Sequence, residues 1–209
     1  MMSYPFNEAE TLRAEIAALA ARMIAEDGAD YATAKKKAAR QLLGNQKVKG
    51  DILPDNAQIE QEVREYNQLF LSDTQPQRLL HLRKLAVRLM TEMERFHPLL
   101  VGAALNGTAG EHSEIYLHLY PDNTKEVSIY LLNRNIQFDV SETQGARGEM
   151  LETLSFLHEN EGVHLVLFDQ DYQRGGKNQE RADLAAVQAL VDASTESDSI
   201  RHTGLLQRR

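Results

Sequence analysis

The chain has 209 residues, of which 42% are hydrophobic and 26% charged, values typical of a globular protein with a substantial core. It has no cysteine, which excludes disulfides, thiolate catalysis and cysteine-ligated zinc. The net charge of -8 weighs against a nucleic acid partner, because such binding needs cations that neutralise phosphates. No apolar run has the roughly 20 residues of a membrane span, and the start does not have the pattern of a signal peptide, so we expect no membrane partner and a cytoplasmic location.

Residues 1–97 are predicted to form a helical region, because their apolar residues recur with helical spacing. Four such helices have apolar faces that predict a bundle, packed against one another, against a sheet or against a partner chain or second copy. Turn and capping residues predict that these helices end at the EDG of 26–28, run from Asp30 to Gly44, start at Asp55 or Asn56, and run from the SDTQP of 72–76 to His97.

From Leu99 onward the apolar pattern changes to that of strands. Residues 98–195 are therefore predicted to form an α/β domain with a small mixed sheet, followed by a tail, 196–209, without regular structure. Separate helical and strand-containing blocks indicate the α+β class. The strands are expected in LLVGAAL (99–105), EIYLHLY (114–120), NIQFDV (135–140) and VHLVLFD (163–169), with helices after the PDNT of 121–124 and around Leu184.

The stretch GAALNGTAGEHSEIYL, Gly102 to Leu117, resembles the nucleotidyltransferase superfamily, the group of DNA polymerase beta and small bacterial nucleotidyltransferases. The family pattern is roughly G-S-x-x-x-G-x-A-x-x-x-S-D-I-D-L, and it aligns here without a gap. The resemblance implies that nucleotide is bound by this stretch, with magnesium or manganese held by carboxylates. The implied nucleotide-binding residues are Gly102, Ala103, Gly107, Thr108, Ser113 and Tyr116.

The chain departs from this pattern at the positions that carry the chemistry. Ala103 replaces a phosphate-binding serine, Glu114 replaces the first metal-binding aspartate, and Tyr116 replaces the second. Asp139 falls where the third carboxylate is expected. A phenol is a poor magnesium ligand at neutral pH, so the resemblance implies a degenerate site in which Glu114 and Asp139 are the remaining catalytic candidates.

A rebuilt metal site is one alternative, since Glu114, His118 and Asp139 offer carboxylate and imidazole ligands for a single ion. The other interpretation is that His118 is a half-buried polar residue and that the two carboxylates are exposed on strands. Tyr116 and Tyr120 similarly either stack on a nucleobase or pack as ordinary strand aromatics.

A serine hydrolase is not indicated by the sequence. Ser113 and Ser155 lack the Gly-x-Ser-x-Gly turn of a nucleophilic serine, and His164 is one of several scattered histidines without metal-ligand spacing.

Three functions remain open at this point. The first is a nucleotidyltransferase-like protein that binds a nucleotide or a partner after losing or remodelling its catalytic site. The second is an active metal-dependent nucleotidyltransferase that uses Glu114 and Asp139. The third is a regulatory or antitoxin-like protein that acts on a partner through its helical half.

Overall fold

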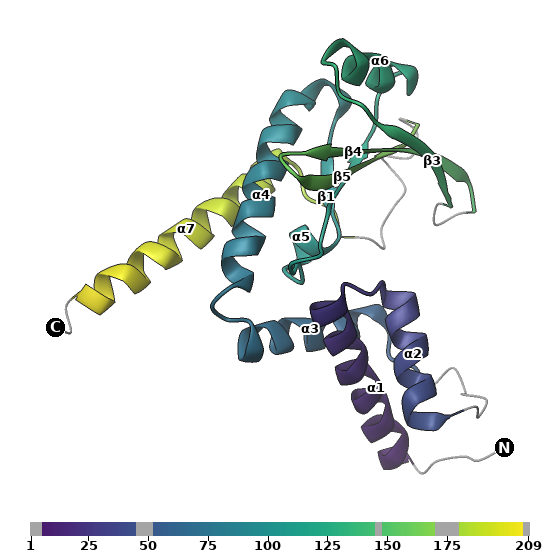
Figure 1. Cartoon of the computed structure of the whole chain (residues 1–209), viewed down its shortest axis with the longest axis vertical. Helices are drawn as coiled ribbons and strands as arrows, with labels where there is room; N and C mark the ends of the chain where they lie inside the picture. The colour runs from purple at the N-terminus through teal and green to yellow at the C-terminus, as the bar shows by residue number, and fades with distance from the viewer. Residues whose placement is uncertain (1–5, 45–51, 145–147, 170–179, 207–209) are drawn as a thin grey trace. The chain divides into compact units, whose positions relative to one another are not determined.

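The computed structural model describes residues 6–44, 52–144, 148–169 and 180–206, and it has the expected α+β class (Figure 1). The chain divides into two compact units. The first contains residues 1–78 and 107–113, and the second contains 79–106 and 114–209. The sequence placed the change between 97 and 98, whereas the structure groups most of the fourth helix with the sheet. Within the described residues, no helix is both long and apolar enough to cross a membrane.

The first unit is built from three helices with an alanine-rich core. Asp30 accepts a hydrogen bond from the Thr33 backbone N–H, and Asp55 forms a reciprocal capping box with Gln58, so both predicted helix starts are confirmed. Small side chains let the helices approach closely around the buried Ile16, Ile59 and Val63. The helices are α1 (Phe6–Asp27), α2 (Tyr31–Leu43) and α3 (Asn56–Phe70).

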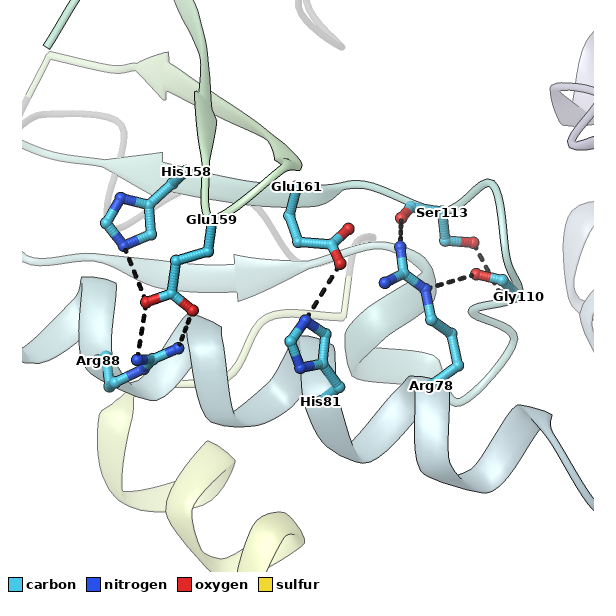
Figure 2. A network of polar contacts seen from close by, with 8 residues as sticks. All are labelled: Arg78, His81, Arg88, Gly110, Ser113, His158, Glu159 and Glu161. Carbon is cyan, nitrogen blue, oxygen red and sulfur yellow. Dashed lines mark hydrogen bonds and ion pairs between the residues drawn. The ribbon is translucent and has the colours of Figure 1, made fainter.

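A loop of the first unit, residues 107–113, is held by side chains from the start of the next helix, α4 (Gln75–Glu92). The Gln75 side-chain amide donates to the Gly107 and Ala109 carbonyls at 3.1 and 2.8 Å. Arg78 donates to the carbonyls of Gly110 and Ser113 (Figure 2). The loop is therefore anchored through its backbone oxygens.

The second unit carries one five-stranded sheet in the order β1-β2-β5-β4-β3. Only the β2–β5 pair is parallel, so the sheet is mixed as predicted. The strands are β1 (Leu99–Val101), β2 (Ile115–Leu119), β3 (Asp139–Gln144), β4 (Met150–His158) and β5 (Glu161–Leu167), and the other elements are the 3-10 turn η1 (Glu94–Phe96), α5 (Ala103–Asn106), α6 (Lys125–Asn133) and α7 (Leu184–Leu206).

Successive rows of residues across the sheet lie on opposite faces. One row joins Leu100, Leu117, Leu165 and Leu154, which are all fully buried and form the hydrophobic side of the sheet. The adjacent row must point to the other face, because side chains alternate along every strand. That second face carries the polar residues described below.

The β4–β5 hairpin is fixed to α4 by charged side chains. Its two turn residues, Glu159 and Asn160, have φ of 52° and 67°, the conformation of a tight type I′ hairpin turn. Arg88 binds both carboxylate oxygens of Glu159, at 2.9 and 2.7 Å, and His81 lies 3.1 Å from Glu161 (Figure 2). These contacts hold the start of β5 against the helix.

Four elements differ from the sequence prediction. The first expected strand ends at Val101, and α5 follows where strand was expected. β3 begins at Asp139, near the end of the predicted 135–140 segment, and β4 was not predicted at all. α7 continues to Leu206 instead of ending near 195, because no proline interrupts it.

Candidate functional site

A row of polar side chains crosses four strands on the second face of the sheet. Tyr116 on β2 pairs with His164 on β5, His164 pairs with Ser155 on β4, and Ser155 pairs with Asp139 on β3. Directly paired residues share a face, so these four side chains, here called the polar row, lie on one side. Tyr116 and Asp139 are exposed and Ser155 and His164 are half-buried, so the polar row lies on the face of the sheet that solvent reaches.

Within and beside the polar row, three side chains form a continuous hydrogen-bonded chain. The Ser155 hydroxyl lies 2.8 Å from Nδ1 of His164, and Nε2 of His164 lies 2.7 Å from Glu114 Oε2. The His164 side chain is 20% exposed and that of Glu114 is 47% exposed, so solvent reaches both. The order serine, imidazole, carboxylate is that of a nucleophile, its base and an orienting group.

Gly162 makes room for this chain on the sheet surface. A Cβ built on Gly162 would lie 2.7 Å from the Glu114 carboxyl carbon and 2.9 Å from its Cγ. Any side chain at this position would therefore displace Glu114. The glycine leaves room for the carboxylate next to β5, within reach of the imidazole.

Tyr116 completes the site from the β2 side. Its ring stacks on the His164 ring with centroids 4.4 Å apart and planes inclined by 18°, which restricts the imidazole's rotation. Burial of one side, and then the nearby Glu114 charge, raise the pKa of the Tyr116 phenol, so it stays neutral at pH 7. The residue is still 40% exposed, so part of its surface is available to a ligand.

Two residues that the sequence suggested for metal or nucleobase binding are instead packed inside the second unit. His118 is buried with its ring 4.6 Å from that of Phe168, and burial together with the Arg181 charge lowers its pKa to about 4. Tyr120 is also buried, stacks on Phe168 and accepts a hydrogen bond from Arg181. Both residues therefore have the packing role that the sequence left as the alternative to ligand binding, and both side chains are buried.

The metal clamp expected from Glu114, His118 and Asp139 does not fit the arrangement. β2 and β3 are separated by β5 and β4, three strand spacings or about 14 Å. Two oxygens on one magnesium or manganese ion lie within about 5 Å, and here the His164–Ser155 pair lies between the two carboxylates. Among the described residues, no group of three or more histidine or acidic side chains is placed to hold a metal.

The residues of the expected phosphate-binding turn are distributed between the two units. Gly102, with φ of 72°, and Ala103 lie where β1 ends and α5 begins in the second unit, from here on called the sheet unit. The first unit, from here on called the helical unit, contains Gly107, Thr108 and Ser113. There Thr108 is buried near the Tyr31 hydroxyl, and the Ser113 hydroxyl accepts the Gly110 N–H, so both side chains have structural roles.

Sequence reasoning gave Ser155 and His164 no functional role, and it did not mention Gly162. The strand that carries Ser155 was not recognised, although Thr153 and Ser155 alternate with the apolar Leu154 and Phe156 ahead of the Glu159-Asn160 turn. That alternation before a turn was the available signal for a hairpin. Without β4, nothing in the sequence brings Ser155 next to His164.

No model of a known protein family matches this chain, and no curated protein or solved structure matches it either. The relationship to nucleotidyltransferases is therefore a resemblance carried by Gly102–Leu117 alone. A functional proposal for this protein therefore rests on the geometry of the polar row and of the side chains beside it.

Proposed function

We propose that the sheet unit binds the base and sugar of a nucleotide on its polar row, without the two-metal chemistry of active nucleotidyltransferases. The observation that carries this proposal is the half-exposed Tyr116 ring, stacked on His164 in line with the hydrogen-bonding groups of Ser155 and Asp139. Bases stack on exposed aromatic rings in a sequence-tolerant way, and neighbouring polar groups supply acceptors and donors for their edges.

Charge makes the proposed ligand class more specific. Asp139 ends the polar row on β3, and the Glu114 carboxylate lies beside His164, so both charges repel phosphate groups. The substitution of the family's second aspartate by Tyr116 exchanges a metal ligand for a stacking surface. We therefore expect nucleosides to bind at least as tightly as the corresponding triphosphates, and magnesium to leave nucleoside binding unchanged.

The test is calorimetric titration of the full chain with the four nucleosides and their triphosphates, each with and without magnesium. Tyr116→Ala should weaken nucleoside binding by about tenfold, because stacking on an aromatic contributes roughly 1–3 kcal/mol per base. Phe70→Ala, which removes an exposed ring from the helical unit, should bind as the unaltered chain does.

Two outcomes would overturn the proposal. Magnesium-dependent triphosphate binding that is lost in Asp139→Ala would favour the metal-dependent enzyme. Failure of every nucleoside and nucleotide to bind would favour a protein that acts through a partner.

A further inference from the structure

The hydrogen-bonded series of side chains Glu114, His164 and Ser155 has a feature that ligand binding alone does not require. A carboxylate only accepts hydrogen bonds, so the Nε2 of His164 beside Glu114 carries the proton. In the neutral ring the other nitrogen, Nδ1, is then the acceptor, and it lies 2.8 Å from the Ser155 hydroxyl. The hydroxyl proton therefore points at a base whose opposite side is held by a carboxylate.

The geometry also keeps this base in one orientation. Glu114 binds one edge of the His164 ring, Ser155 binds the other, and Tyr116 covers a face at 4.4 Å. Gly162 leaves the space in which the Glu114 carboxylate lies. A polar pair needed only for strand pairing would require neither that space nor the stacked ring.

We propose that Ser155 is an activated nucleophile for acyl transfer from esters, with His164 as its general base and Glu114 as a positioning residue. In the first step the Ser155 oxygen bonds to the ester carbonyl carbon, and its proton moves to Nδ1 of His164. The ester C–O bond then breaks, and the leaving alcohol takes the proton back from the imidazolium. Water repeats the sequence on the acyl-serine and releases the acid.

The position of Ser155 in the sheet limits the rate of this reaction. β4 pairs with β3 on one side and β5 on the other, so its backbone N–H groups are used in the two ladders. Backbone donors to the carbonyl oxygen of the reacting ester usually supply a large part of the rate. We therefore expect covalent reaction with activated reagents and slow turnover. The inference does not rest on nucleotide binding, although both use the same face.

The test is labelling of the full chain with a fluorophosphonate, followed by intact mass measurement and peptide mapping. The Ser155 oxygen forms a bond to phosphorus, fluoride leaves, and the proton passes to His164. We expect a single adduct on Ser155, none on Ser155→Ala, and labelling about 100-fold slower in His164→Gln, since general-base catalysis contributes at least that factor. Ser141→Ala, which removes an exposed hydroxyl from β3 on the same face, should label at the normal rate.

Gly162→Ala tests the role of Glu114 without changing any reacting group. Displacing the carboxylate should slow labelling and change the His164 ring nitrogen shifts in NMR spectra, because the carboxylate then no longer holds the proton on Nε2. Circular dichroism establishes that each variant is folded. An unlabelled folded protein, an adduct elsewhere, or His164→Gln and Gly162→Ala that label normally would overturn the proposal. Nucleoside titration of Ser155→Ala reports separately on the binding function.

Discussion

Gly162 on β5 and Glu114 beside β2 are matched so closely that a single methyl group on the glycine would occupy the space of the carboxylate. The added Cβ would lie 2.7 Å from the Glu114 carboxyl carbon. The Glu114 side chain is 47% exposed, so it can swing into solvent without disturbing the core. A substitution at Gly162 should therefore change the geometry of the site and leave the stability of the fold nearly unchanged.

Gly162→Ala should leave the free energy of unfolding within about 0.5 kcal/mol of the starting value, because only an exposed side chain has to move. The same change should break the bond between Glu114 and His164, seen as altered imidazole nitrogen shifts in NMR spectra. Gly110→Ala is the matched control, since its added Cβ would meet only the Ala25 carbonyl oxygen, at 3.6 Å. A Gly162→Ala variant with unchanged His164 nitrogens would contradict the role assigned to the glycine.

Gly28 and Gly44 provide a second matched pair, one at the end of each of the first two helices. Both have left-handed φ, 66° and 63°, but only a Cβ on Gly28 would collide with another residue, at 2.6 Å from the His112 Cβ. Gly44→Ala should cost about 2 kcal/mol of backbone strain, because its ψ of -137° lies outside the left-handed helical region, and Gly28→Ala should cost about 3 kcal/mol because the contact with His112 adds to its strain. Urea unfolding measures both values. Equal losses would show that the loop carrying His112 moves away freely.

Arg83 anchors α5 from inside the sheet unit. It is buried, and it donates to the Ala104 and Leu105 carbonyls at 2.8 and 2.9 Å. Arg83→Met should destabilise the fold by about 3 kcal/mol in chemical unfolding, since both carbonyls lose a charged donor. Arg88→Met removes an arginine from the same helix, but its pair with Glu159 is exposed, so little change is expected. Similar losses in the two variants would contradict this account.

His118 should make stability depend on pH. Its pKa in the folded chain is about 4, below the 6.5 of an exposed histidine, because burial and the Arg181 charge disfavour the imidazolium. The unfolded chain therefore binds more protons between these values. Stability should be fully present above pH 6.5 and fall by about 3 kcal/mol as the pH drops to 4.

The measurement is urea unfolding between pH 7 and pH 4, with the His118 titration followed by NMR. His118→Gln has no imidazole to protonate, so its stability should change less over this range. A variant that keeps the full pH dependence would assign the effect to other groups.

The sequence determined the features that depend on neighbouring residues. Helix starts at Asp30 and Asp55 were predictable because each cap satisfies backbone N–H groups only three residues away. β2 was predictable because the alternation of side chains around Tyr116 also lies within a few neighbouring residues. These local patterns were enough for the α+β class.

The tertiary structure alone decided which distant residues meet. The hairpin of β4 and β5 inserts two strands between Glu114 and Asp139, which separates the expected metal ligands and places Ser155 against His164. Strand order depends on contacts between segments far apart in the chain, and the spacing of residues within one segment carries no record of it. For that reason the motif of Gly102–Leu117 suggested a metal site, whereas the assembled sheet places Ser155 and His164 between the two carboxylates.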